Sequence, residues 1–537
     1  MSEPAAKKEE RRKFQAIRGT RDLLPPETAL WTRVEQTAHE VFRTFGYGEI
    51  RVPIFEPTEL FARAVGGETD IVSKEMYSFE EGQSKGLFGD GEGMQDSMDF
   101  INAQNSPILM DKYLNDLTAE YETGAIARTA DNERAIATIR SVSKELFAIS
   151  KPSDEGPEDL AIKRFFEYVA LRKPFEEKLQ DAWLQIRKRD QISLRPEATA
   201  SVCRAYIEHN MQQLPQPVKL YYMGPMFRRE RPQKGRYRQF YQIGAEVLGG
   251  TDAPAIDAEV IEMLVTFFDR LGLEGTELSI NSIGHAVDNC RRGYVEELRS
   301  ELNKVKDKLG ADSQRRIDTN PLRVLDSKLE HEQPIIAALP KIADHLCDEC
   351  KTHYAAVKRD LDLRGVKYVE NWRLVRGLDY YMRTAFEITA RGLGSQNAVC
   401  GGGRYDGLVE LLGGPPTKGI GFAIGEDRLI LSLQESGKAP SQQSLDVYIA
   451  WMGPNAYATA IRAAKNLRAA GVSVELPPTE QKFGKALERS SKLNAKFALI
   501  LGDNEVSSGE WTLKTLATGD QTKITEANLL AHLKQRQ

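Results

Sequence analysis

The residues best suited to chemistry lie in a basic stretch of a chain that is acidic overall. Between Phe227 and Glu246 there are six basic residues and two acidic ones, whereas the 537-residue chain has a formal net charge of −5. Apolar and aromatic residues alternate up to Arg228, a polar loop with Pro232 and Gly235 follows, and a second alternating run comes after it. This pattern predicts a β-hairpin.

The two strands of this hairpin can direct polar side chains into one space. Because side chains alternate along a strand, Gln242, Gly244 and Glu246 share one face of the second strand. Arg228 ends the first strand, and the planar guanidinium of arginine fits phosphate and carboxylate oxygens. The alternative is a sheet surface laced with salt bridges.

The stretch LRPEATASVCRAYIEH predicts a helix that begins beside a carboxylate. Pro196 stands at its start, Glu197 lies in the first turn, where the helix dipole favours a negative charge, and Thr199 lies just beyond. Simple helix capping accounts for the same residues and is preferred for this stretch taken alone.

Three later stretches also carry candidate ligand-binding residues. CGGGRYDGLVELLGG sets Gly401–Gly403 before Tyr405, so a ligand can approach the backbone closely. GIGFAIGEDRLILSL predicts a strand that ends at Gly425 and a helix that bears Arg428, where a flat-ringed ligand could lie on the glycines and the arginine reach its phosphates. WRLVRGLDYYMRTAFEI predicts a turn between apolar strands with Arg376, Asp379, Tyr380 and Tyr381. The alternatives are an ordinary glycine cluster, a solvated arginine and a buried ion pair.

The elements that position these residues must span three or more domains, because 537 residues exceed one ordinary domain. Helical spacing of apolar residues predicts a helix over residues 31–45, after Pro25 and Pro26, and EIRVPIFEP predicts a strand ended by proline. KEMYSF and QISLRPE predict two strands that would pair as a hairpin if the residues between them were removed. The charged, helical segment 85–188 is therefore interpreted as a domain inserted in a hairpin loop.

The second half of the chain continues this mixed pattern. An amphipathic helix is predicted from about Ala255 to Leu271, residues 285–366 are mostly helical in pattern, and SGKAPSQQS (436–444) has the composition of a linker. Residues 445–537 alternate apolar strands with helices, which predicts a small α/β domain. That part has 12 basic and 9 acidic residues, a net charge of +3, so the rest of the chain carries −8. The excess weakly favours an anionic partner for the tail.

Composition excludes several classes of protein. Charged residues make up 28% and hydrophobic residues 41%, as in soluble globular proteins, and no apolar run approaches the roughly 20 residues that span a bilayer. The start, MSEPAAKKEERRKFQ, lacks the apolar core of a signal peptide and is expected to be disordered. Five cysteines suit a reducing cytoplasm. Cys347 and Cys350 form a C-x-x-C without a second pair or a nearby histidine, which favours two helix residues over a metal or redox site.

Taken together, several stretches in this order resemble the histidyl-tRNA synthetases, a family of class II aminoacyl-tRNA synthetases: RGTRDLLPPE, LRPEATA, FRRERPQKGRYRQF, LVRGLDYY, GGGRYDGL and GFAIGEDRL. The resemblance covers residues 16–84 and 189–537. It implies an α/β fold class, with an α+β catalytic domain built on an antiparallel sheet, a C-terminal α/β anticodon-binding domain and helical insertions. The domains expected are a disordered lead (1–15), a catalytic domain in three parts (16–84, 189–284, 367–435), an inserted helical domain (85–188), a second helical insertion (285–366), a linker (436–444) and the anticodon-binding domain (445–537).

The resemblance implies activation of L-histidine by ATP to histidyl-adenylate, followed by transfer to the 3′ end of tRNA(His). In-line attack of a carboxylate on the α-phosphate brings two anions together, so positioning and charge neutralisation matter more than proton transfer. By similarity, Arg228 contacts the α-phosphate and the carboxylate, Arg376 neutralises the same centre from the opposite side, and Arg428 stands on the γ-phosphate side.

The other roles are also implied by the resemblance. The residues implied to hold the substrate's α-ammonium are Glu197, Thr199 and Gln242, and Ala198 is implied to bind the substrate beside them. Glu246 and Tyr381 would bind the imidazole nitrogens, in a site that rejects analogues without those hydrogen bonds, and Tyr380 and Tyr405 would wall the pocket. The remaining residues implied to lie near ATP are Arg236 and Phe240, and those near the tRNA acceptor end are Gln233 and Lys234.

The implied partners are ATP, L-histidine, tRNA(His) and a second copy of the chain, with no membrane. Magnesium would accompany ATP through its phosphates rather than bind in a dedicated protein cage, and the basic tail would contact the anticodon. The helix at 31–45 and the strand ending at Pro53 resemble the segment that makes the family's dimer interface.

The sequence departs from the family pattern at two positions, and one alternative function remains. Arg229 stands where a histidine is usual and Asp427 where a glutamate is usual, and the insertion 85–188 has no counterpart that assigns it a function. Non-catalytic relatives serve as histidine-binding regulatory subunits of ATP phosphoribosyltransferase, but they usually lack the C-terminal module and the arginine of LVRGLDYY, and this chain keeps both. A stand-alone tRNA-binding module would not explain the amino-acid pocket.

Overall fold

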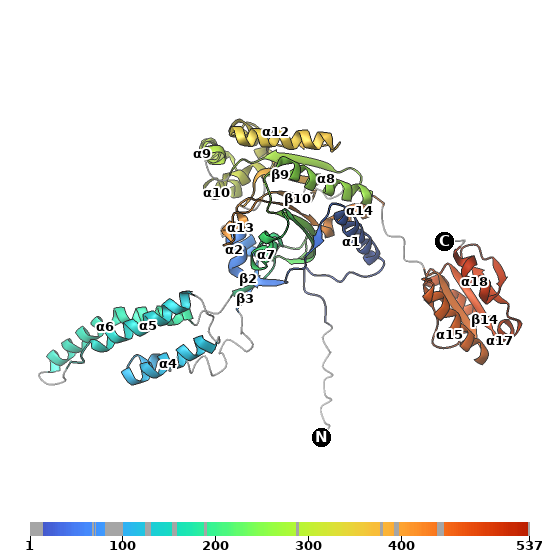
Figure 1. The fold of residues 1–537 in the computed structure, drawn as a ribbon, viewed down its shortest axis with the longest axis horizontal. Coiled ribbons are helices and arrows are strands. Elements are labelled where there is room, and N and C mark those ends of the chain that lie inside the picture. The colour runs from blue at the N-terminus through green and yellow to red at the C-terminus, as the bar shows by residue number, and fades with distance from the viewer. Residues whose placement is uncertain are drawn as a thin grey trace, which may run out of the picture. The chain divides into compact units, whose positions relative to one another are not determined.

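Figure 1 shows the computed structural model, which describes residues 14–66, 69, 71–80, 100–123, 130–152, 158–186, 191–285, 289–375, 380–390, 397–437 and 445–534. The chain divides into two compact units, one of residues 1–54, 63–75 and 196–537 and the other of residues 55–62 and 76–195. Arg376 and Asp379 lie outside the described residues. No helix in the described part of the chain is both long and apolar enough to cross a membrane.

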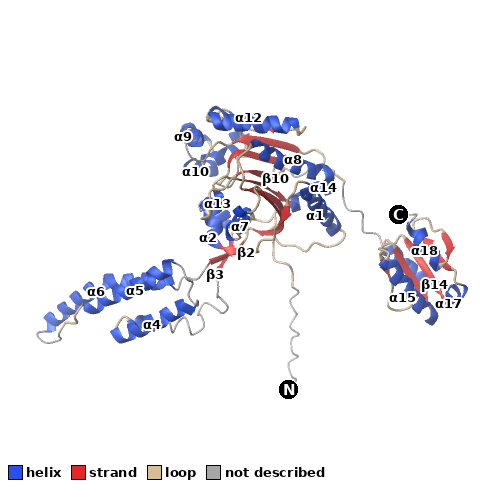
Figure 2. Cartoon of the chain, in the orientation of Figure 1, coloured by secondary structure: helices blue, strands red, loops and turns tan. Residues whose placement is uncertain are grey.

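The larger unit is built on a mixed sheet, drawn in red in Figure 2. Within the described residues it has eight strands in the order β1-β5-β6-β11-β10-β9-β7-β8. All neighbours pair antiparallel except β1 with β5 and β7 with β8 at the two edges, so the antiparallel sheet expected from the resemblance forms its centre. The strands are β1 (Gly48–Glu49), β5 (Val218–Phe227), β6 (Gln239–Leu248), β7 (Glu277–Ser282), β8 (Val369–Glu370), β9 (Met382–Thr389), β10 (Ala398–Arg404) and β11 (Gly419–Gly425).

One face of this sheet carries the main hydrophobic core. The helices that contribute to it are α1 (Glu27–Thr44), α8 (Pro254–Leu271), α12 (Asp348–Leu363) and α14 (Glu426–Glu435). Ile243, Ala245 and Val247 of β6 point into this core. The intervening Gln242, Gly244 and Glu246 therefore lie on the opposite face, as the alternation in the sequence predicted.

The N-terminal segment matches its predicted helix but not its predicted strand. Helix α1 confirms the helix predicted over residues 31–45, and its apolar side is buried in the chain's own core. The stretch EIRVPIFEP is not one strand: β1 ends at Glu49, and β2 (Phe55–Pro57) belongs to a different sheet. The prediction was wrong because an apolar run does not show which sheet its two ends join. The helix α2 (Thr58–Val65) and the turn η1 (Ile71–Glu75) follow.

The smaller unit contains the inserted segment. Strands β3 (Tyr77–Glu80) and β4 (Gln191–Leu194) pair antiparallel, which confirms the predicted hairpin, and β2 joins the other edge of β4. The helices described between them are α4 (Pro107–Thr123), α5 (Ala130–Ala148) and α6 (Glu158–Ile186). Phe100 stacks on Trp183 with ring centroids 5.3 Å apart, and the Trp183 indole N–H donates to the Tyr113 hydroxyl at 2.8 Å. These helices thus share a core of their own.

Residues 285–366 are mainly helical, as predicted. The α-helices are α9 (Asn289–Lys304), α10 (Ala311–Thr319), α11 (Gln333–Ala337) and α12. Short 3₁₀ helices separate them, namely η3 (Lys306–Lys308), η4 (Pro321–Asp326), η5 (Glu330–Glu332) and η6 (Ile342–Asp344).

The C-terminal part is an α/β sandwich, which confirms the predicted class. Its described sheet has the order β13-β12-β14-β15-β16, with α15 and α18 packed on one face and α16 on the other. The strands are β12 (Val447–Met452), β13 (Val474–Glu475), β14 (Phe497–Gly502), β15 (Trp511–Thr515) and β16 (Gln521–Ile524), and the helices are α15 (Pro454–Ala469), α16 (Phe483–Lys492), α17 (Asp503–Ser508) and α18 (Glu526–Lys534). Strand β16 was not predicted, because three of its four residues are polar.

Candidate functional site

The polar face of β6 holds a buried carboxylate between two hydroxyl groups. Glu246 is 1% exposed, and it accepts the Thr199 hydroxyl at 2.7 Å and the Tyr405 hydroxyl at 2.5 Å. Burial raises the pKa of Glu246 to about 8, and the nearby charge of Glu197 adds to the rise although both hydroxyl bonds oppose it. A ligand that brings N–H groups or positive charge would stabilise the ionised form.

Glu197 is a second buried carboxylate in the same pocket. It accepts the backbone N–H groups of Thr199 at 2.7 Å and Ala200 at 3.0 Å. Because α7 (Thr199–Glu208) begins at Thr199, with Ala198 as its N-cap residue, Glu197 precedes the helix instead of lying in its first turn. The capping interpretation is confirmed. Burial raises the pKa of Glu197, although these hydrogen bonds and the positive charge of Arg228 act to lower it.

Aromatic rings and one amide complete this acidic pocket, which we define by Glu197, Thr199, Gln242, Glu246 and the tyrosines. Tyr380 packs against Tyr381 and Tyr405, with ring centroids 4.7 and 5.8 Å apart. The amide oxygen of Gln242 is buried without a hydrogen-bond partner among the described residues. An unpaired buried acceptor is costly, so this oxygen is suited to an N–H group of a ligand.

Glycines of the neighbouring strands make room for the pocket instead of for a ligand. A Cβ on Gly421 would lie 1.7 Å from a carboxylate oxygen of Glu246, and a Cβ on Gly403 would lie 3.0 Å from the Tyr381 ring. A Cβ on Gly402 would meet the Gly421 carbonyl oxygen at 2.4 Å. The predicted role of the 401–403 cluster is thus wrong for Gly402 and Gly403, whereas Gly401 lines a cavity.

That cavity, which we call the arginine cavity, has a volume of about 250 Å³ and lies beside Gln242. Its lining includes Arg228, Arg236, Phe240, Gly425 and Arg428, all of them expected near ATP. The guanidinium of Arg228 lies 5.1 Å from the centre of the Phe240 ring, and its Nε donates to the Pro196 carbonyl at 3.0 Å. Arg228 therefore stands between the cavity and the acidic pocket.

The cavity concentrates positive charge. Burial lowers the pKa of Arg428, and the neighbouring charges of Arg236 and Arg228 lower it further. Glu230 lies 3.1 Å from Arg236 and 3.9 Å from Arg228, so one carboxylate offsets two guanidinium groups. Glu387 and Asp427 are further carboxylates in the lining, and Asp427 is paired with Arg21, which lies outside it, so that four guanidinium groups face three carboxylates. A phosphate chain would supply the remaining negative charge, which gives the cavity the character of an anion site.

The hairpin loop forms as the sequence predicted. Gln233 and Arg236 exchange backbone hydrogen bonds of 3.1 and 2.9 Å that close the loop. Lys234 is exposed and its ammonium donates to Glu435 at 2.8 Å.

Asp427, which stands where the family usually has a glutamate, makes two structural hydrogen bonds that the sequence did not predict. Its carboxylate accepts the Tyr241 backbone N–H at 2.9 Å and an Arg21 guanidinium N–H at 3.1 Å. It also lines the arginine cavity, so it lies nearer the ATP end than expected. The other departure, Arg229, is exposed, and its backbone N–H donates to the Glu75 carbonyl at 2.7 Å.

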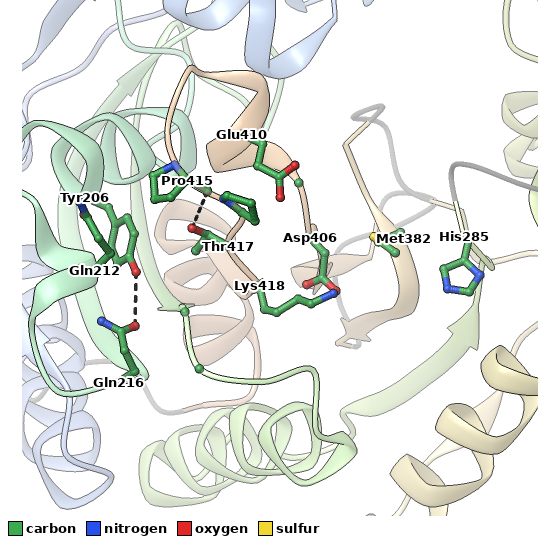
Figure 3. A pocket seen from close by; sticks show the side chains of 14 residues that line it. Tyr206, Gln212, Gln216, His285, Met382, Asp406, Glu410, Pro415, Thr417 and Lys418 are labelled. Atoms are coloured by element: carbon green, nitrogen blue, oxygen red, sulfur yellow. Dashed lines mark hydrogen bonds and ion pairs between the residues drawn. The ribbon is translucent and has the colours of Figure 1, made fainter.

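A larger hollow of about 580 Å³ lies apart from these residues (Figure 3). Tyr206, Gln216, Asp406 and Lys418 line it, and none of the residues predicted to bind histidine, ATP or tRNA does. The Tyr206 hydroxyl donates to Gln216 at 3.3 Å, and Lys418 lies 3.4 Å from Asp406. Its polar groups largely pair with one another, so size alone does not mark the site.

Known proteins resemble this chain over nearly all of its length. The family model described as histidyl-tRNA synthetase matches residues 164–429, and the one described as anticodon binding domain matches residues 446–536. The chain is 44% identical to the histidine–tRNA ligase of Koribacter versatilis (97% of this chain, 96% of that one). It is 43% identical to that of Solibacter usitatus (97% and 99%).

Solved structures agree with these relatives. Apo histidyl-tRNA synthetase of S. aureus has a TM-score of 0.65 at 30% identity, over 97% of this chain and 100% of that one. A Bacillus halodurans protein described as an ATP phosphoribosyltransferase regulatory subunit/histidyl-tRNA synthetase has a TM-score of 0.51 at 18% identity, over 94% and 100%. The second likeness shows a common fold only.

Proposed function

The chain belongs to the histidyl-tRNA synthetase family and acts as a histidine–tRNA ligase, and we propose that the two ends of its site divide the substrates between them. Histidine binds in the acidic pocket and ATP in the arginine cavity. The observation that carries this proposal is the separation of charge: two buried carboxylates and an unpaired amide oxygen lie at one end, and three arginines at the other.

In the acidic pocket, Glu197, Thr199 and Gln242 hold the α-ammonium of histidine, with Ala198 beside them at the start of α7. The Glu246 carboxylate accepts a hydrogen bond from one imidazole nitrogen, and the Tyr381 hydroxyl donates one to the other. Tyr380 and Tyr405 form the walls of the pocket around the ring. The raised pKa of Glu246 supports this assignment, because the N–H of an imidazole stabilises the carboxylate form. A pocket built on such hydrogen bonds rejects side chains that cannot make them.

In the arginine cavity, the carboxylate of histidine attacks the α-phosphate of ATP, which forms histidyl-adenylate and releases pyrophosphate. Arg228 stabilises the developing charge at this centre, with Arg376 as its proposed counterpart by family resemblance. Arg428 binds the γ-phosphate side, and Arg236 and Phe240 hold the nucleotide. Glu230 and Glu387 offer oxygen ligands to the Mg²⁺ that enters on the phosphates, and this ion would offset phosphate charge.

The aminoacyl group then passes to the 3′ end of tRNA(His), with Gln233 and Lys234 contacting the acceptor end. We assign the anticodon to residues 445–537, which carry the net positive charge. The regulatory-subunit alternative is less supported, because the anticodon binding domain model matches the C-terminal part.

The proposed enzyme is a homodimer of the cytoplasm, where its five free cysteines stay reduced. The apolar side of α1 is occupied by the chain's own core. A partner would therefore cover the exposed side chains near the N-terminal segment, such as Phe14, Ile17 and Leu24. Sedimentation of the full chain would test this, and a monomer at working concentrations would contradict it.

Histidine-dependent exchange of pyrophosphate into ATP tests the function most simply. The full chain should exchange with histidine and with no other amino acid, and it should charge tRNA(His). A chain that ends at residue 437 should keep part of the exchange and lose most of the charging. Binding of histidine without exchange would instead support a regulatory subunit.

A further inference from the structure

Four side chains with metal-binding atoms meet at the junction between the sheet and the 285–366 helices. His285 and Cys290 follow β7, Cys347 is the N-cap residue of α12, and Cys350 lies in the first turn of that helix. One ligand atom from each lies within 4.8 Å of the other three. The expectation that the C-x-x-C has no histidine nearby is therefore wrong, because folding brings His285 across 62 positions of sequence.

We propose that His285, Cys290, Cys347 and Cys350 form a structural zinc site. The imidazole Nδ1 lies 3.6 Å from the Cys347 sulfur and 3.3 Å from the Cys350 sulfur. In a tetrahedral zinc site, with Zn–S of about 2.3 Å and Zn–N of about 2.0–2.1 Å, the sulfur and nitrogen atoms are about 3.6 Å apart. The four atoms thus already stand near the corners of such a site. A closed set of three thiolates and one imidazole is typical of structural zinc.

The backbone holds this arrangement in place. The Ile283 N–H donates to the Arg383 carbonyl at 2.7 Å, and the Arg383 N–H donates to the Gly284 carbonyl at 2.8 Å. Gly284 has a φ of +67°, and a Cβ there would lie 2.8 Å from the Cys290 sulfur. Glycine thus permits both the turn and the approach of the thiol.

The thiols also carry the electrostatics of a cation site. Cys290 and Cys350 are 3% and 0% exposed. A divalent cation would stabilise all three thiolates, at the cost of releasing their protons to solvent.

The second imidazole nitrogen has a partner for the metal-bound state. Nε2 of His285 lies 2.9 Å from an Arg383 nitrogen and 3.6 Å from a Glu349 carboxylate oxygen. When Nδ1 binds zinc, Nε2 keeps its proton and needs an acceptor. For Glu349 to become that acceptor, the Arg383 guanidinium, whose N–H now faces Nε2 at 2.9 Å, must shift, and it retains Asp252 at 2.8 Å. Glu349 is therefore a positioning residue.

The site would fasten the start of the 285–366 segment to the start of α12, next to the residues that lead into β9. Arg291, next to Cys290, donates to the backbone carbonyl of Tyr381 at 2.7 Å. Figure 3 shows His285 beside Met382, the next residue along the chain, at one end of the large hollow. The hollow gives an ion a route to His285. Zinc would thus stiffen the segment that carries Tyr381.

Metal analysis of the full-length chain, purified without a histidine tag or chelator, tests the proposal. We expect about one zinc per chain, and Co²⁺ in its place should give thiolate charge-transfer bands and tetrahedral d–d bands. Cys350→Ser should lose the zinc, whereas Cys203→Ala, which removes a buried thiol outside the cluster, should keep it. Glu349→Gln should lower zinc affinity by roughly 10- to 100-fold, whereas Asp348→Asn should not.

Any one of three results would contradict the zinc site. The wild-type chain could retain no zinc after zinc loading and desalting, it could contain iron in place of zinc, or the freshly isolated protein could contain a Cys347–Cys350 disulfide. If Cys350→Ser does not fold, the cobalt spectrum of the wild-type chain still decides, since a spectrum without thiolate bands contradicts thiol ligation.

Discussion

The acidic pocket and the arginine cavity treat charge in opposite ways. In the pocket, Glu246 and Glu197 are 1% and 5% exposed and are held by neutral hydroxyl and backbone N–H donors. In the cavity, the Arg228 and Arg236 side chains are 21% and 37% exposed around open space. Each end favours a ligand of the opposite charge: the buried carboxyl groups ionise when a ligand brings N–H groups or positive charge, and the guanidinium groups bind phosphate oxygens. Preorganised charge of this kind serves catalysis because it needs no rearrangement during the reaction.

The arginine end should be the more sensitive for chemistry. Arg228→Ala should slow histidyl-adenylate formation roughly 100- to 1,000-fold, because one good donor to a developing charge stabilises the transition state by about 3–4 kcal/mol. Single-turnover kinetics with ATP and histidine would measure this. Arg231→Ala removes the same charge from an exposed position in the same loop and should have little effect. Equal losses in both variants would mean that only the net charge of the hairpin matters.

The acidic end should be sensitive to shape. Gly421→Ala places a methyl group where the Glu246 carboxylate lies, 1.7 Å from its oxygen. We expect kcat/KM for histidine to fall on the order of 100-fold, since a misplacement of about 1 Å can cost that much. The Kd for ATP should change little.

Gly484→Ala is the matched control, because a Cβ there meets nothing within 4 Å. A Gly421→Ala enzyme with normal histidine kinetics would show that Glu246 does not bind the substrate.

The smallest expected effect is on stability. The pKa of Glu246 is about 8 in the folded chain and 4.5 as its ordinary value. Between these pH values the folded state keeps a proton that the unfolded chain has lost, so this group makes the free energy of unfolding fall as pH rises. Glu246→Gln should flatten that fall, and its unfolding temperature should gain on the wild type from pH 5 to pH 8. The exposed Glu296→Gln should follow the wild type.

The sequence predicted one strand of the site better than its surroundings. Period-two alternation put Gln242 and Glu246 on one face of β6, because strand geometry alone dictates it. The space for Glu246 depends on Gly421 of β11, its direct partner across the sheet. A register between strands so far apart in sequence cannot be derived from local pattern, so this glycine was missed.

The same limit applies to the cysteines. Cys290 approaches Cys347 across 57 positions, and its sulfur accepts the Cys347 backbone N–H at 3.4 Å. Local spacing showed the C-x-x-C but not the two residues that join it. The family resemblance supplied the roles of Arg228 and Arg428, which residue patterns alone left open between a ligand site and ordinary salt bridges.

Equilibrium binding of histidine and of ATP to two variants tests the division of the site most directly. Glu246→Gln should weaken histidine at least tenfold and leave the Kd for ATP within about twofold, whereas Arg428→Ala should do the reverse. Isothermal titration calorimetry of each ligand alone, at pH 7 and at a temperature where both variants are fully folded, gives the four dissociation constants. If either variant weakened both ligands equally, or if each weakened the other's ligand, the assignment of histidine to the acidic pocket and ATP to the arginine cavity would be wrong.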